Sequence, residues 1–233
     1  MPTTDYQPLD ISDLCNADAS VLGADKTIPV GERDYHGLPF VLGGDTDRAV
    51  IAGGGGASMD DVTIPVGATA RTAIIAHRLV DSKVYEGDPI GRVCADYTFV
   101  YADGSELVIP MRERLEIGII PSGWGQLALL AYPDTNDGLV ARHEGQWGAA
   151  GHRQTEANQA WPQDFYLWVW VNPHPDVELS EIRVTPKGPT FYIGGITLGH
   201  ANEHPFTRIA KKDVKLELLR EEDASKRFDL SAR

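Results

Sequence analysis

The fold class is indicated by one stretch, Arg92-Val93-Cys94-Ala95-Asp96-Tyr97-Thr98-Phe99-Val100-Tyr101, and by the residues that follow it. Apolar or aromatic side chains occupy every second position from Val93 to Tyr101, and alternate residues of a strand share one side of a sheet. Asp103-Gly104 comes next, a pair that tolerates the positive φ angles of a tight hairpin turn. Glu106-Leu107-Val108-Ile109-Pro110 then predicts the returning strand.

Working outward from this hairpin, further short apolar runs predict more strands, with turn residues between them. The runs are residues 26–31, 38–42, 165–171, 179–185 and 191–198. A total of 24 Gly and 15 Pro suits a chain with many turns. The sequence Asn172-Pro173-His174-Pro175-Asp176 predicts a rigid corner, because proline fixes φ and side chains such as Asn172 cap turns.

These elements predict an all-β fold, an antiparallel β-sandwich that is jelly-roll-like. Residues 121–160 have no sustained period, and they predict one long irregular loop region, a kind of segment that is often functional. We expect residues 1–210 to form a single sandwich domain. Residues 211–233 alternate at first and are then densely charged, which predicts a C-terminal strand or tail, or a linker to a missing domain.

The charge of the chain lowers the expectation of several partners. The net charge of −13 repels nucleic-acid phosphates and anionic membrane surfaces, so we expect neither as a partner. The apolar runs are far shorter than the roughly 20 residues of a spanning helix. The N-terminus has no signal-peptide pattern, so we expect a soluble, cytoplasmic protein. Cys15 and Cys94 are expected to be buried thiols, with a disulfide between them as the alternative.

Aromatic side chains supply the first candidate ligand contacts. Tyr166, Trp168 and Trp170 share one face of a predicted strand, where flat rings can stack on the C–H faces of sugars. The alternative is that this face packs in the core, as large aromatics usually do. Trp124 and Trp147 fall in the irregular region, where loop residues often bind ligands.

Polar and metal-binding candidates lie in the same irregular region. Asp134, Asn136 and Asp137 form an oxygen-rich turn that predicts a calcium site or, alternatively, an ordinary Asx turn. The seven histidines show no strong zinc spacing. His152 is a candidate ligand contact, and together with His143 it is the candidate for a polar catalytic site.

Three segments resemble a β-sandwich domain found in multidomain proteins that act on sugars. They are Gly37-Leu38-Pro39-Phe40; Tyr97-Thr98-Phe99-Val100-Tyr101-Ala102-Asp103-Gly104 with Ile109-Pro110-Met111-Arg112 and Glu116-Ile117-Gly118; and Trp170-Val171-Asn172-Pro173-His174-Pro175-Asp176, followed by Ile182 and Gly195-Ile196-Thr197. The resemblance covers roughly residues 8–200. Such domains are similar to galactose-binding or jelly-roll modules, and they usually accompany a catalytic domain.

The resemblance implies a non-catalytic accessory module that binds carbohydrate or docks to a carbohydrate-active catalytic partner. Two alternatives stay open at this point. One is a subunit of a sugar-active hydrolase or lyase, with a polar site in the 121–160 loop. The other is a structural module that mediates homo-oligomerisation. No residue is assigned as catalytic, and calcium is the one cofactor that the sequence brings into consideration.

Overall fold

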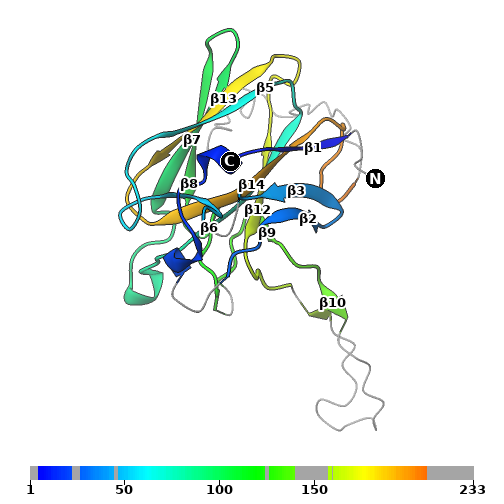
Figure 1. The fold of residues 1–233 in the computed structure, drawn as a ribbon. Coiled ribbons are helices and arrows are strands. Elements are labelled where there is room, and N and C mark those ends of the chain that lie inside the picture. Colours follow the sequence, from blue (N-terminus) through cyan, green and yellow to red (C-terminus); the bar gives the residue numbers. More distant parts are fainter. Residues whose placement is uncertain are drawn as a thin grey trace, which may run out of the picture. The chain divides into compact units, whose positions relative to one another are not determined.

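The structure is a computed structural model, and it describes residues 5–22, 27–44, 47–123, 126–139, 157–158 and 160–208. The chain divides into two compact units, Met1–Ala201 and Asn202–Arg233. All named strands belong to the first unit (Figure 1). The predicted 211–233 tail lies outside the described residues, so its form and the domain boundary at 210 stay predictions.

The described residues of the first unit form two antiparallel sheets and two smaller hairpins. The larger sheet has the order β1 (Tyr6–Leu9), β14 (Phe191–Gly199), β6 (Thr72–Leu79), β12 (Tyr166–Val171) and β9 (Ala131–Pro133), with β4 (Ile51–Gly53) also on β14. The smaller sheet has the order β5 (Val62–Ala68), β13 (Leu179–Pro186), β7 (Val93–Tyr101) and β8 (Glu106–Arg112). The hairpins pair β2 (Gly31–Tyr35) with β3 (Leu38–Leu42), and β10 (Gly138–Leu139) with β11 (Ala157–Asn158).

The predicted all-β sandwich is confirmed. Of the described residues, 47% are in strands and 5% are helical, and the helical ones form three short 3-10 turns: η1 (Ser12–Leu14), η2 (Ala19–Leu22) and η3 (Val84–Glu86). No helix within the described residues is long and apolar enough to cross a membrane. Cys15 and Cys94 are both buried thiols, so the disulfide alternative is wrong.

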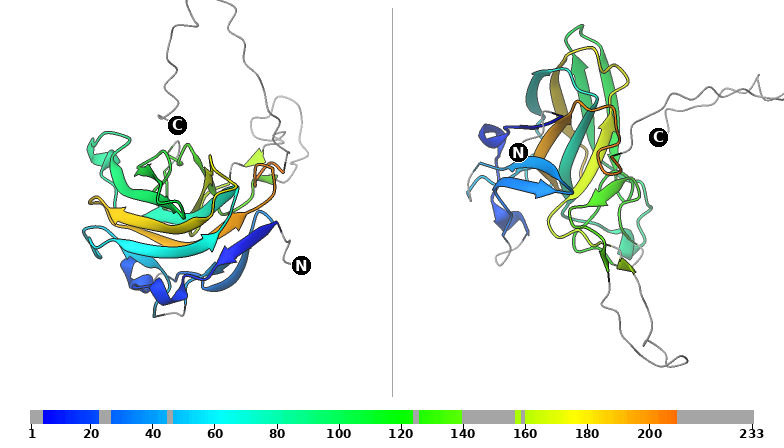
Figure 2. Two further views of the ribbon diagram at one scale, coloured as in Figure 1. Left: turned by 90° about the horizontal axis from the view of Figure 1, so that it is seen from above. Right: turned by 90° about the vertical axis from the view of Figure 1, so that its right-hand side faces the viewer.

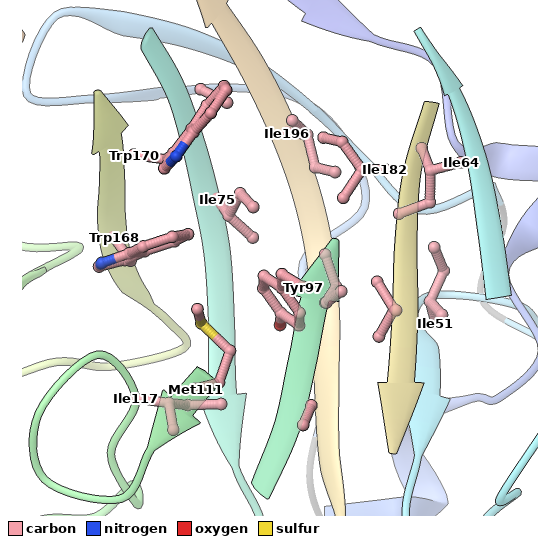
Figure 3. Close-up of a cluster of buried hydrophobic side chains, with 14 of the residues drawn as sticks. Ile51, Ile64, Ile75, Tyr97, Met111, Ile117, Trp168, Trp170, Ile182 and Ile196 are labelled. Atoms are coloured by element: carbon pink, nitrogen blue, oxygen red, sulfur yellow. The ribbon is translucent and has the colours of Figure 1, made fainter. Parts of the chain in front are cut away.

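The core lies between the two sheets. Side chains from β6 and β12 of the larger sheet meet those of β7 and β13 of the smaller one, as Ile75, Trp168, Tyr97 and Ile182 show in Figure 3. All four side chains are buried. Removing this apolar area from water is the main force that holds the two sheets together.

The hairpin predicted at residues 92–110 is confirmed as β7 and β8. Gly104 has φ of +84° in the connecting turn, which is the left-handed conformation that Asp-Gly pairs allow. Tyr97 and Phe99 are fully buried on the inner face, as their spacing predicts. Val93 departs from the pattern: a register shift between Val93 and Ala95 displaces it, and it is 37% exposed.

Four of the other predicted strands are found as β3, β12, β13 and β14, with ends within one residue of prediction. The strand predicted at 26–31 is wrong, because β2 begins only at Gly31. Pro29 has no N–H to donate to a sheet, and Gly31, the first residue of β2, has φ of +81°, so the extended backbone of β2 does not continue back through residues 27–30. The predicted corner at Asn172 is confirmed: it connects β12 to β13, and the Asn172 carboxamide oxygen accepts a bond from the backbone N–H of His174, 2.8 Å away.

The hairpin of β2 and β3 covers the outer face of the larger sheet (Figure 2, left, blue beside the orange β14). The Thr197 hydroxyl on β14 donates to the carbonyl oxygen of Pro39 at 2.6 Å. Side chains of Phe40 and Leu42 come so close to Gly195 that a Cβ there would lie 2.8 Å from Leu42. Covered on both faces, the neighbouring strand β6 has all eight of its residues buried.

His77 makes a polar contact across the core. The Nδ1 atom of His77 on β6 lies 3.0 Å from the Tyr97 hydroxyl on β7, and Nε2 lies 3.0 Å from the carbonyl oxygen of Glu116. A carbonyl only accepts, so Nε2 carries the proton and Nδ1 accepts from Tyr97. Burial lowers the pKa of His77 to about 4, which keeps the ring neutral near pH 7.

Candidate functional site

The two tryptophans predicted on one strand face, Trp168 and Trp170, lie in the core. They are 6% and 4% exposed, and Figure 3 shows both pointing inward from β12. The Trp170 ring stacks on Phe99 with centroids 3.6 Å apart, so another side chain occupies the face that a sugar would need. The sequence left two placements open for these rings, a sugar-binding surface and the core. In this structure both rings lie in the core.

Three further predicted ligand contacts, Trp124, Trp147 and His152, lie outside the described residues, as does His143. Their roles stay predictions.

The oxygen-rich turn at Asp134 is described, and its carboxylates bind backbone amides. Asp134 accepts hydrogen bonds from the N–H groups of Gln163, Asp164 and Phe165 at 2.8, 2.7 and 3.0 Å. Asp137 accepts one from Ala160 at 2.8 Å, while Asn136 is exposed. Within the described part of the chain, no group of three or more His, Cys, Asp or Glu side chains is placed to hold a metal ion. Through its bonds to residues 163–165, Asp134 holds the segment before β12 in place, and we call this arrangement the Asp134 clamp.

The described residues form a pocket beside this clamp, with a cavity volume of about 300 Å³. Its described lining comes from the end of η2, from Thr27, from the end of β6, from the connection that follows β8, and from the segment before β12. The lining residues are Leu22, Thr27, Arg78, Val80, Ile120, Pro121, Pro162, Gln163 and Asp164. Apolar walls with a few polar groups are typical of small-ligand sites.

Arg78 is the most deeply buried polar residue of this pocket, with 6% exposure. Its Nη2 donates to the carbonyl oxygen of Ile120, and its guanidinium carbon lies 5.4 Å from the centre of the Tyr192 ring. The Nε–H has no hydrogen-bond partner among the described residues. Burial lowers the pKa of Arg78, although Tyr192, Asp164 and Asp134 act in the opposite direction. The guanidinium nevertheless keeps its charge, as arginine does throughout proteins.

Asp164 is the acidic group of the pocket. It is half-buried, and its carboxylate accepts no hydrogen bond from the described residues. Its backbone N–H is held by Asp134, which fixes where the residue sits. Burial raises the pKa of Asp164, and the nearby Asp134 carboxylate adds to this, whereas Arg78 and Arg33 lower it. The hydrogen bond from the Asp164 N–H to Asp134 thus positions the Asp164 carboxylate, whose oxygens stay available to accept hydrogen bonds from a ligand.

Arg78 therefore has an N–H donor and Asp164 a carboxylate acceptor, and the two groups do not bind each other. No direct ion pair joins them, although both line the same pocket. An unmade hydrogen bond of a buried polar group costs about 1–3 kcal/mol. The Nε atom is closed to solvent in this conformation, so a ligand reaches its N–H only when the Arg78 side chain turns. A ligand that then accepts from the Nε–H and donates to the carboxylate removes that cost. A hydroxyl group does both, because it has one donor and two acceptor lone pairs.

Sequence reasoning missed this pocket. Arg78 stands inside the apolar run from Thr72 to Leu79, where a charged side chain needs a partner, and this was the one local signal. Its neighbours Ile120 and Asp164 come from distant parts of the chain, so no spacing connects them.

No protein-family model matches the sequence, and no curated protein matches it either.

Proposed function

We propose that the chain is a non-catalytic accessory module that binds a neutral carbohydrate in the Arg78 pocket. The observation that carries this proposal is the pair of unused groups, the Arg78 Nε–H and the Asp164 carboxylate, in one pocket of about 300 Å³. A sugar offers adjacent hydroxyls that can pair with both. The apolar walls, among them Pro121 and Pro162, match the C–H faces of a pyranose ring.

The pocket is of a suitable size class for such a ligand. Small-molecule sites start at about 300 Å³ and combine apolar walls with a few convergent polar groups. Gln163 adds an exposed carboxamide at the rim, which supplies both donors and an acceptor. The resemblance of the three sequence segments to sugar-associated sandwich domains supports the same proposal.

Binding is favoured over glycoside hydrolysis by the carboxylate count. Asp164 is the only carboxylate among the described residues that line the pocket. Most glycoside hydrolases need two carboxyl groups on either side of the scissile bond. A pocket with one carboxylate and one guanidinium has the groups for recognition, so we propose binding, with catalysis left to a partner.

The experiment is a calorimetric titration of the chain with a panel of neutral mono- and oligosaccharides. Arg78→Gln and Gln163→Ala are compared with Arg183→Gln, an arginine that forms ion pairs with Glu106 and Glu181 on the smaller sheet. We expect Arg78→Gln to lower the affinity about tenfold or more, which corresponds to the ~1.5–3 kcal/mol of a hydrogen bond to a charged group. Arg183→Gln is expected to bind like the wild type.

Circular dichroism and melting temperature show whether each variant is folded. Gln163 is exposed, so its replacement tests the pocket even if Arg78→Gln does not fold. A panel in which no sugar binds, or in which the pocket variants bind as well as the wild type, contradicts the proposal.

A further inference from the structure

The charges around the Arg78 pocket bear on the kind of ligand it admits. Arg78 and Arg33 lower the pKa of Asp164, whereas Asp134 raises it, so two cations and two carboxylates act on this region. The backbone amides of residues 163–165 bind the Asp134 carboxylate, and that of Ala160 binds Asp137. Asp164 is thus the carboxylate that remains exposed to a ligand.

An anionic ligand meets opposing forces in this pocket. Two unit charges attract or repel each other with the same strength at the same distance in the same surroundings. A ligand carboxylate placed between Arg78 and Asp164 is therefore attracted by one and repelled by the other to a similar extent. What remains is the cost of removing the ligand's charge from water. A neutral hydroxyl avoids that cost and still pairs with both groups.

We infer that Asp164 determines the specificity of the Arg78 pocket, excluding sugar acids while it accepts a hydrogen bond from a neutral sugar. This inference rests on the proposed function, because it concerns the same site. It goes further because it names the residue that discriminates between a neutral sugar and its uronic acid. In the uronic acid a carboxylate replaces the C6 hydroxymethyl group.

The test compares each neutral sugar with its uronic acid, using glucose with glucuronate and galactose with galacturonate. Wild type, Asp164→Asn and Asp176→Asn are titrated with both members of each pair at pH 7. Asp176 is an exposed carboxylate in the corner between β12 and β13, so Asp176→Asn makes the same change in net charge away from the pocket. We expect the wild type and Asp176→Asn to prefer the neutral sugar at least tenfold.

Asp164→Asn keeps an acceptor oxygen but removes the negative charge. We expect it to gain affinity for the uronate about tenfold or more, so that the preference nearly disappears. A wild type that binds uronate as well as the neutral sugar overturns the inference and leaves sugar binding intact. The inference is also overturned if Asp164→Asn keeps the wild-type preference or binds neither ligand. If the wild type binds neither member of any pair, the proposed function fails and the inference fails with it.

Discussion

Arg78 on β6 and Tyr192 on β14 are direct cross-strand partners, and the guanidinium carbon lies 5.4 Å from the centre of the tyrosine ring. This places a cation over an aromatic face, an interaction worth about 0.5–2 kcal/mol. The Tyr192 hydroxyl itself has no hydrogen-bond partner among the described residues. The ring, not the hydroxyl, is therefore the part of Tyr192 that positions Arg78.

This relationship predicts different outcomes for two substitutions of Tyr192. Tyr192→Phe keeps the ring and removes a buried hydroxyl that makes no bond, so we expect unchanged sugar affinity and equal or slightly higher stability. Tyr192→Leu removes the ring, and we expect sugar affinity to fall about 2- to 30-fold. Calorimetry on the folded variants measures both. Equal affinities for the two variants would mean that the ring does not position Arg78.

The pKa of His77 predicts a pH dependence of stability. Burial lowers this pKa from 6.5 to about 4, so the unfolded chain binds a proton that the folded chain does not. The contribution of neutral His77 is fully present above pH 6.5 and is lost as the pH falls towards 4. At 1.36 kcal/mol for each pH unit, it amounts to roughly 3 kcal/mol.

Urea unfolding between pH 7 and 4 measures this effect. We expect the wild type to lose more stability over this range than His77→Gln, whereas His174→Gln, an exposed histidine, follows the wild type. The raised pKa of Asp164 acts in the opposite direction, because its folded form gains protons first as the pH falls. Identical pH slopes for the wild type and His77→Gln would show that His77 is not buried neutral.

The Asp134 clamp predicts stability without a metal. Three backbone N–H groups already bind its two oxygens, and hydrogen bonds to a charged group contribute about 1.5–3 kcal/mol each. We expect Asp134→Ala to lower the melting temperature clearly, in calcium and in chelator alike. Thermal unfolding with either additive measures this. A wild-type melting temperature that rises by several degrees in millimolar calcium would support the calcium alternative instead.

The core position of Trp170 predicts a loss of stability when the ring is removed. Trp170→Ala leaves a cavity next to Phe99, and such truncations cost about 3–5 kcal/mol. We expect a large fall in the unfolding free energy, while the fraction that stays folded binds sugar with wild-type affinity. Denaturant titration and calorimetry separate the two quantities. A stable Trp170→Ala variant that has lost sugar binding would place the ring at the ligand.

The fold was more predictable than the site, for a physical reason. In a strand with one solvent-facing side, buried apolar residues alternate with more exposed ones, as they do in β7 around Tyr97 and Phe99. This alternation can be recognised without knowing the rest of the chain. Strand β6 is covered on both faces, so Thr72–Leu79 is uniformly buried and shows no alternation.

Coverage by the other sheet also explains the tryptophans. Spacing tells that Trp168 and Trp170 share a face, but it does not tell whether another sheet covers that face. The Arg78 pocket depends on contacts between segments far apart in the chain, such as Arg78 with Ile120, which lie 42 residues apart. Only the folded chain brings these groups together.

The most direct test of the Arg78 pocket is the NMR resonance of the Arg78 Nε–H group during a sugar titration. Arg78→Lys assigns the resonance by its loss, and the Arg183 Nε–H serves as the internal reference. We predict that the Arg78 signal moves on addition of the neutral sugar that binds best, with the same dissociation constant as calorimetry gives, while the Arg183 signal stays in place. Sugar binding that leaves the Arg78 signal unmoved would contradict the account.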